Sequence, residues 1–401
     1  MKKILLFGAG KIGRSFVAQL FYRSGYEIVF VDINKKLVAL LNNTPSYNVV
    51  VKGDKDYYIE VGNYRAIHFS EKDKLLDEFS TTKLVSTSVG LNALPDLFPL
   101  FAEALVNRYK KTPFAPIDFI IAENLRNADE LFTQNLKTYL PDDYPIEKLV
   151  GLVETSIGKM VPIMSQEDLE ENPLQIFAEE YNSLPLAARA FKNQLPEVQG
   201  FKYITNIKAW VDRKSLIHNL GHAAAVYFGY QEMPEEKYLW KVLSNKKVYE
   251  QTRTSMMQAA NILLKKYPYN FTLSGLEEHV DDLLQRFRNK ALKDTVFRVG
   301  SDLYRKLDKD DRLAGAIKLA IVLGQPFDLI LEALVAGFYF RATDENKQLF
   351  PKDELFNNEL EKTGFENMFK KVTGFNDVFD AKIIKKAIEI ESSIYPIQDY
   401  S

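Results

Sequence analysis

The sequence predicts an α/β protein: an N-terminal, doubly wound parallel sheet with an inserted β-hairpin, followed by a mostly helical C-terminal domain. Three observations support this class. Short apolar runs alternate with helical patterns through about residue 155, which is typical of a parallel sheet covered by helices. A glycine-rich turn directly follows the first apolar run. From about residue 205, β-strand signals fade and long amphipathic segments dominate. We therefore expect two domains, at residues 1–204 and 205–401.

The elements of the N-terminal domain follow from this alternation. Strands of the main sheet are predicted at 3–7, 27–31, 83–86, 119–122 and 149–153, and helices near 12–24, 34–42, 95–109 and 125–139. Two β-rich runs, 47–51 and 57–61, flank a turn that contains Gly53, and they predict a hairpin at the periphery of the domain. In the C-terminal domain, amphipathic helical segments are predicted at 205–229, 235–265, 275–289 and 312–339.

The turn after the first strand has the pattern Gly-x-Gly-x-x-Gly, which predicts a Rossmann-type dinucleotide site. Gly8 would permit the tight turn, Gly10 would let the backbone approach a pyrophosphate, and Gly13 would let the next helix pack against the sheet. Asp32 ends the second apolar run, where its carboxylate would bind the ribose hydroxyls and repel a 2′-phosphate. NAD is therefore favoured, although Lys35 and Lys36 leave NADP open. The predicted cofactor contacts are Gly8, Gly10, Lys11, Ile12, Gly13, Asp32, Thr87 and Val89.

Composition narrows the functional classes. The chain has 52 basic and 54 acidic residues and a formal charge of −2, so electrostatics does not favour nucleic acid or an anionic membrane as a partner. It contains no cysteine, and its four histidines lack metal-ligand spacing, so we expect no metal site. No apolar run reaches transmembrane length, and Lys11 and Arg14 interrupt any signal-peptide core. A cytoplasmic location is expected.

A cluster of polar residues near the start of the helical domain is the candidate catalytic set. At α-helical spacing, Lys214, His218, Asn219 and His222 share an arc of roughly 140°. The apolar continuation 223–228 indicates a helix that runs through the interior. A lysine shielded from water loses affinity for its proton and could serve as a general base, and asparagine amides could stabilise an alkoxide. Asn124, after a predicted strand, could supply a second amide. The alternative is a set of hydrogen-bonded core groups without catalytic function.

The pattern Lys214-x4-Asn219-x2-His222, combined with the glycine-rich start, resembles the polyol-specific long-chain dehydrogenases, the mannitol dehydrogenase family. The likeness covers essentially the whole chain. The segments that carry it are the glycine-rich turn and residues 122–124, 212–214, 298–300 and 305–307. It implies an NAD-linked, metal-independent dehydrogenase in which Lys214 is the general acid/base, Asn124 and Asn219 form the oxyanion site and His222 positions the substrate. It also implies a monomer.

The chain length and a basic segment resemble the phosphate-using members, which implies interconversion of D-mannitol 1-phosphate and D-fructose 6-phosphate. The candidate phosphate ligands are Arg298, Arg305, Lys306 and Arg312. The alternative for each is an ion-pair network with Asp294, Asp302, Asp308 and Asp311. Other open alternatives are a different substrate, namely free mannitol, another pentitol or hexitol, or a hexuronate pair (altronate/tagaturonate or mannonate/fructuronate), and a dinucleotide-binding protein without activity.

One stretch departs from the family pattern. Family members usually carry an acid–arginine pair where this chain has Gly158-Lys159. Lysine lacks the bidentate fork of arginine, so contacts with cofactor or substrate at this point should differ. The assignment of the substrate is the expectation that this departure affects most.

Overall fold

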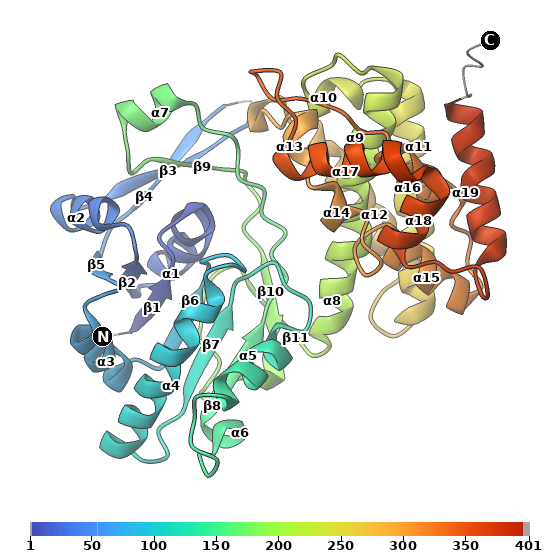
Figure 1. Cartoon of the computed structure of the whole chain (residues 1–401). Coiled ribbons are helices and arrows are strands. Elements are labelled where there is room, and N and C mark those ends of the chain that lie inside the picture. Colours follow the sequence, from blue (N-terminus) through green and yellow to red (C-terminus); the bar gives the residue numbers. More distant parts are fainter. Residues whose placement is uncertain (1, 54, 396–401) are drawn as a thin grey trace. The chain divides into compact units, whose positions relative to one another are not determined.

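The structure is a computed structural model that describes residues 2–53 and 55–395. The chain forms two compact units, Met1–Val211 and Asp212–Ser401. In Figure 1 the first unit runs from blue to green and contains the sheets, whereas the second runs from yellow-green to red and is helical. The predicted α/β class is therefore confirmed.

In the described part of the chain, six parallel strands form the main sheet, in the order β5-β2-β1-β6-β7-β8. Their bounds are β1 (Lys3–Phe7), β2 (Glu27–Asp32), β5 (Tyr64–His68), β6 (Leu84–Thr87), β7 (Ile117–Ile121) and β8 (Val150–Glu154). This is the doubly wound order, in which β1 and β6 are neighbours at the point where the winding reverses. Ligands of such sheets bind beyond the carboxyl ends of these strands. The strand β5 was not predicted, because its sequence Tyr-Arg-Ala-Ile-His is too polar for an apolar run.

Alternate residues of β1 belong to two cores, one on each face of the sheet. Ile4 and Leu6 pack in one core, and Leu5 and Phe7 pack in the other. The first face is covered by the π-helical turn η1 (Gly13–Ala18), α1 (Gln19–Tyr22) and α2 (Lys35–Asn43). The second face is covered by α3 (Lys72–Thr81), α4 (Leu94–Lys111), α5 (Ala128–Lys137) and α6 (Ile146–Leu149). Part of the helix predicted at 12–24, Gly13–Ala18, is π-helical.

The hairpin is present as β3 (Tyr47–Val51) and β4 (Tyr57–Val61), paired antiparallel. Its predicted peripheral position is wrong for β3. Val49 is fully buried in the first core, and β3 also pairs in parallel with β9 (Ile176–Ala178). The hairpin therefore adds a second, three-stranded sheet to the unit. The remaining elements of this unit are α7 (Gln166–Glu171), η2 (Ala188–Ala190), and the parallel strands β10 (Leu184–Ala187) and β11 (Phe201–Ile204).

Helices build the second unit. The segment predicted at 205–229 comprises α8 (Ile207–Arg213), which spans the boundary of the units, the π-helical η3 (Lys214–Asn219) and α9 (Leu220–Glu232). The other helices are α10 (Leu239–Val242), α11 (Lys246–Lys266), α12 (Leu273–Phe287), η4 (Lys290–Leu292), α13 (Val296–Gly300), α14 (Leu303–Lys306), α15 (Ala314–Leu323), α16 (Asp328–Phe338), α17 (Pro351–Thr363), α18 (Phe365–Thr373) and α19 (Ala381–Ile394). The prediction for 312–339 missed the break at Gly324, whose φ of +63° ends α15.

The helix α9 forms the centre of this unit. Its residues from Ala223 to Phe228 are all buried, which confirms the predicted passage through the interior. Among the described residues, no helix has both the length and the apolar character needed to cross a bilayer.

Candidate active site

The glycine-rich turn lies at the carboxyl end of β1, and two of its glycines are required by the fold. Gly8 has a φ of +94°, a conformation that favours glycine, and a Cβ there would lie 2.5 Å from the Ser88 carbonyl oxygen. A Cβ at Gly13 would lie 2.0 Å from the Gly8 carbonyl oxygen. In contrast, a Cβ at Gly10 would meet no atom within 4 Å. Space therefore remains open at the one glycine that the motif assigns to the approach of a pyrophosphate.

Asp32 supports this turn from the end of β2. One carboxylate oxygen accepts a 2.8 Å hydrogen bond from the Ala9 amide, and the other accepts a 2.9 Å bond from the Asn34 amide. Each oxygen retains a second lone pair, so the carboxylate can still accept hydrogen bonds from a ribose. Of the two remaining predicted contacts in the turn, Lys11 is exposed and Ile12 is partly buried.

The segments after β6 and β7 are joined by Glu123. Its buried carboxylate accepts hydrogen bonds from the amides of Val89, at 2.8 Å, and Gly90, at 3.0 Å. Burial raises the pKa of this carboxyl group above its ordinary value, although the two amides oppose the shift. Glu123 thereby fixes the loop that follows Thr87, beside the glycine-rich turn. The sequence predicts that this segment lies at a strand end, but it does not indicate a role for Glu123; the signal it offers is an acidic residue close after an apolar strand.

Lys214 and Asn219 are the first and last residues of η3. The Leu220 amide donates to the Ser215 carbonyl, five residues earlier, which is the hydrogen bond of a π-helix. A π-turn contains more residues than an α-turn, so residues five apart return to the same side. The predicted α-helical arc is therefore wrong for this segment, and the π-turn aligns Lys214 with Asn219 more closely than α-helical spacing would.

The environment of Lys214 favours loss of its proton. Burial, together with the positive charge of Arg312, lowers the pKa of the Lys214 ammonium to about 8, while Asp311 opposes the shift. Arg312 is itself buried; it donates to the Asp311 carboxylate at 2.7 Å and to the Asn219 carbonyl at 3.3 Å. The same arginine therefore connects the two ends of η3 electrostatically.

The two histidines of the cluster have different surroundings. His222 stacks on Phe287, with ring centroids 4.4 Å apart and planes inclined by 11°. Its Nε2 lies 3.6 Å from the Asp294 carboxylate, beyond hydrogen-bonding distance, and has no hydrogen-bond partner among the described residues. Burial lowers the pKa of His222, with Asp294 opposing. His218 is buried against the same phenyl ring, and burial holds its pKa well below the ordinary value. Because both pKa values are lowered, we infer that His218 and His222 carry neutral imidazoles at neutral pH.

The predicted phosphate ligands are mostly paired with carboxylates. Arg298 pairs with Asp294, and Arg305 pairs with Asp302. Lys306 is buried, and its ammonium donates to the carbonyls of Val299, at 2.6 Å, and Ser301. These contacts match the ion-pair alternative for the arginines, while Lys306 supports the backbone between α13 and α14. Within residues 2–53 and 55–395, no group of three His, Cys, Asp or Glu side chains could hold a metal ion.

Asn124 and Lys159 belong to the first unit. Asn124 follows β7, directly after Glu123, whereas Lys214 belongs to the second unit. The predicted approach of Asn124 to Lys214 therefore stays a prediction. Lys159 is buried, and its ammonium donates to the Glu179 carbonyl at 2.5 Å and to the Asn182 side chain at 2.7 Å. The lysine that replaces the usual arginine therefore has structural partners within its own unit.

Comparison with known proteins identifies the family. Residues 2–200 match the model of the mannitol dehydrogenase Rossmann domain, and residues 206–393 match the mannitol dehydrogenase C-terminal domain. The mannitol-1-phosphate 5-dehydrogenase of Thermoanaerobacter pseudethanolicus is 30% identical over 397 residues, 98% of this chain and 99% of that protein. The enzyme of the same name from Caldanaerobacter subterraneus subsp. tengcongensis is 27% identical, over 98% of this chain and 100% of that protein.

Solved structures show the same fold. A D-sorbitol dehydrogenase in substrate-free form superposes with a TM-score of 0.79 at 18% identity, covering 98% of this chain and 92% of that one. The Pseudomonas fluorescens mannitol 2-dehydrogenase, in a ternary complex with NAD and D-mannitol, gives a TM-score of 0.75 at 14% identity with the same coverage. Both domain models and the full-length relatives lead to one conclusion: the chain belongs to the mannitol dehydrogenase family.

Proposed function

We propose that this chain is an NAD-dependent dehydrogenase that interconverts D-mannitol 1-phosphate and D-fructose 6-phosphate without a metal ion. The observation that carries the proposal is the lowered pKa of Lys214 within a π-turn that also presents Asn219. The full-length relatives named mannitol-1-phosphate 5-dehydrogenase support the choice of substrate. Arg298 and Arg305 of the same unit carry the guanidinium groups that a sugar phosphate would need, although each is paired with an aspartate.

The first unit fits a dinucleotide. The open space at Gly10 accommodates a pyrophosphate, and Asp32 ends β2 where the ribose of the adenosine would lie. Thr87 ends β6 at the reversal of the winding, Val89 lies two residues further on, and the Glu123 carboxylate accepts a hydrogen bond from the Val89 amide. When bound, the nicotinamide supplies the acceptor for the hydride in oxidation.

In the oxidation, neutral Lys214 accepts the proton of the reacting hydroxyl, and the carbon that bears this hydroxyl loses a hydride. The amides of Asn219 and Asn124 donate hydrogen bonds to the oxygen, on which negative charge develops. His222 offers its imidazole to a neighbouring hydroxyl. In the reduction, the Lys214 ammonium returns the proton to the ketone oxygen.

For the phosphate we propose Arg298, Arg305 and Arg312. Arg298 and Arg305 are each about half exposed. Arg305 can exchange its partly exposed Asp302 carboxylate for a phosphate at modest cost, whereas Arg298 has to keep the buried Asp294 and donate to a phosphate through its other N–H groups. Lys306 was in the predicted set, but its two carbonyl partners and its burial favour a supporting role.

Replacing Arg305 with glutamine should raise the KM for fructose 6-phosphate about 10- to 100-fold, with a small change in kcat. The reason is the loss of one charge-assisted hydrogen bond, which contributes about 1.5–3 kcal/mol. Steady-state kinetics with fructose 6-phosphate measures the effect, and Lys385→Gln, an exposed lysine of α19, is the control for a lost positive charge. An unchanged KM for fructose 6-phosphate in Arg305→Gln would show that Arg305 does not bind the phosphate.

The activity itself is tested by following NADH oxidation with fructose 6-phosphate, fructose, tagaturonate and fructuronate in the presence of a metal chelator. We expect a strong preference for fructose 6-phosphate and for NADH over NADPH. Activity with only another ketose would change the substrate assignment but keep the family. Binding of NADH without turnover of any ketose would favour a protein without catalytic function.

The pH dependence of the two directions should be opposite. With a Lys214 pKa of about 8, the neutral amine needed for oxidation is lost as the pH falls below that value. The ammonium needed for reduction is lost as the pH rises above it. We therefore expect kcat for mannitol 1-phosphate oxidation to fall on the acid side of pH 8, and kcat for fructose 6-phosphate reduction to fall on the alkaline side. The same slope in both directions would contradict the role of Lys214.

A further inference from the structure

Arg14, the residue directly after the third glycine of the motif, is buried although it carries a charge. Its guanidinium group donates to two backbone carbonyls, that of Ala9 through Nε at 2.8 Å and that of Leu174 through Nη1 at 2.5 Å. Burial lowers the pKa of Arg14 below its ordinary value, because the charged form loses its hydration. Since burying a charge costs free energy, the two carbonyls that Arg14 holds mark a backbone whose position matters.

Arg14 connects the glycine-rich turn with the second sheet of the unit. Leu174 is buried and lies two residues before β9. The Arg14 carbonyl accepts a 2.9 Å hydrogen bond from the hydroxyl of Tyr47, the first residue of β3. Because β3 and β9 are paired, both anchors of Arg14 lie at the sheet that the inserted hairpin builds. The hairpin therefore supports the glycine-rich turn through this one side chain.

Within the turn, Ala9 is held on both sides. Its amide donates to the Asp32 carboxylate at 2.8 Å, and its carbonyl accepts from Arg14. The peptide bond between Ala9 and Gly10 is trans and planar, so the Ala9 carbonyl and the Gly10 N–H point in opposite directions. Because the carbonyl is directed to the buried guanidinium group, the Gly10 N–H is directed away from it. Gly10 is exposed, and no residue in the described part of the chain accepts a hydrogen bond from its amide.

We propose that Arg14 is a positioning residue of the dinucleotide site: by holding the Ala9 carbonyl, it directs the Gly10 amide toward the pyrophosphate. A backbone amide is a suitable donor to a phosphate oxygen, and a donor that is already oriented loses less entropy on binding. Arginine suits this role because its planar fork donates to two carbonyls in fixed directions. The inference rests on the NAD site of the proposed function and is independent of its substrate.

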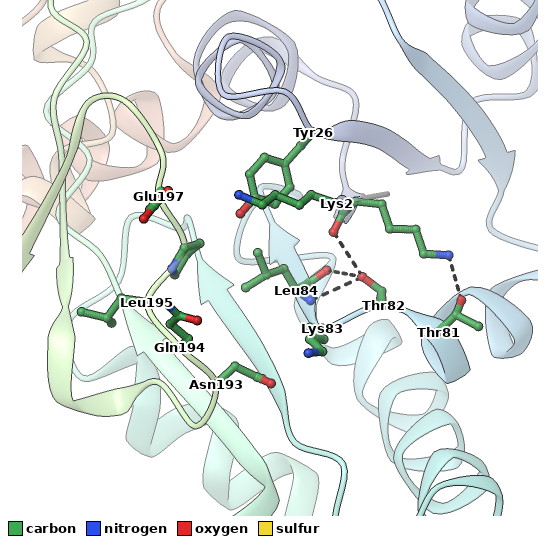
Figure 2. A pocket seen from close by; sticks show the side chains of 12 residues that line it. Lys2, Tyr26, Thr81, Thr82, Lys83, Leu84, Asn193, Gln194, Leu195 and Glu197 are labelled. Atoms are coloured by element: carbon green, nitrogen blue, oxygen red, sulfur yellow. Dashed lines mark hydrogen bonds between the residues drawn. The ribbon is translucent and has the colours of Figure 1, made fainter.

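Arg108 of α4 provides a matched control in the same unit. It is also buried, and its guanidinium group donates to three backbone carbonyls at 2.6 to 3.2 Å. One of these carbonyls belongs to Pro116, directly before β7, so Arg108 supports the amino end of that strand. At this same edge of the sheet, Figure 2 shows a cavity lined by Tyr26, directly before β2, and by Leu84, the first residue of β6. The glycine-rich turn lies at the other edge.

The test compares Arg14→Met with Arg108→Met. Each variant removes a buried guanidinium group and leaves its carbonyls without that donor, so both should lower the Tm. NADH is then titrated by fluorescence, without a ketose and below both unfolding transitions. The Kd for NADH should rise about 10- to 100-fold in Arg14→Met, as for the loss of a hydrogen bond to a charged group, and stay unchanged in Arg108→Met.

The outcomes of this comparison separate two kinds of failure. Equal Kd values for NADH in the two variants would overturn the proposal, because Arg14 would then have only the structural role of Arg108. A wild-type protein that does not bind NADH would instead contradict the NAD site of the proposed function.

A double variant with Gly10→Ala shows whether Arg14 acts through the pyrophosphate contact. If both residues act on one contact, their effects on the Kd for NADH should not be additive. Arg14→Met should therefore raise the Kd much less in the Gly10→Ala background than in the wild type. The same fold-change in both backgrounds would overturn the proposal.

Two further measurements apply if Arg14→Met does not fold. Arg14→Lys keeps the positive charge but not the planar fork, so its Kd for NADH should also exceed that of the wild type. A wild-type Kd in Arg14→Lys would show that charge alone suffices and would overturn the proposal. Hydrogen exchange, followed by mass spectrometry, needs no variant: the Gly10 amide should exchange quickly in the free protein and slowly with NADH bound. A Gly10 amide that is protected without NADH, or unprotected with it, would equally overturn the proposal.

Discussion

Replacing Lys214 with alanine should lower kcat about 10²- to 10⁴-fold, the usual contribution of a positioned general acid/base. The lysine lies in η3 of the second unit, whereas the glycine-rich turn and Asp32 lie in the first, so the Kd for NADH should be nearly unchanged. Stopped-flow measurement of hydride transfer, together with fluorescence titration of NADH, separates the two effects.

A matched variant tests whether charge or proton transfer matters at this position. Lys214→Arg keeps a positive charge, but a guanidinium stays protonated at any working pH and cannot act as the base. It should therefore be nearly as slow as the alanine variant in oxidation. The proposed mechanism would be refuted by a Lys214→Ala protein that keeps turnover within about threefold of wild type.

The second large effect is expected at Gly10 and Gly13, which form a matched pair. In Gly13→Ala, the new Cβ would lie 2.0 Å from the Gly8 carbonyl oxygen, which belongs to the backbone and cannot move aside easily. Overpacking of this kind destabilises by about 1–3 kcal/mol or more. In Gly10→Ala, the new Cβ meets no protein atom within 4 Å, so stability should be kept. The new Cβ of Gly10→Ala would instead occupy the space that the motif assigns to the pyrophosphate.

Thermal unfolding and NADH titration distinguish the two variants. We expect a lowered Tm for Gly13→Ala. For Gly10→Ala we expect an unchanged Tm, with a Kd for NADH raised about 5- to 100-fold, the binding equivalent of the same steric cost. If Gly10→Ala binds NADH like the wild type, the pyrophosphate does not lie against Gly10.

Much of the first unit could be predicted because its signals are local. The strands β1 and β2 are short apolar runs, and the pattern of Gly8, Gly10 and Gly13 follows one of them directly. The strand β5 and the burial of β3 could not be predicted in this way. Both depend on neighbours distant in the sequence: β5 pairs with β2, and β3 pairs with β9. A strand whose burial depends on such partners carries little of that information in its own residues.

The sequence by itself determined the fold class, the family resemblance and the residue types of the candidate site, because periodicity and motif spacing are properties of adjacent residues. Only the tertiary structure decided the electrostatic state of those residues. Lys214 has a lowered pKa because burial and Arg312, far along the chain, act on it together. The π-turn that aligns it with Asn219 is equally invisible in the sequence, since a segment of six residues is too short to reveal a change in the period of its apolar residues. Charges and hydrogen bonds act through space, and the fold alone brings their partners within range.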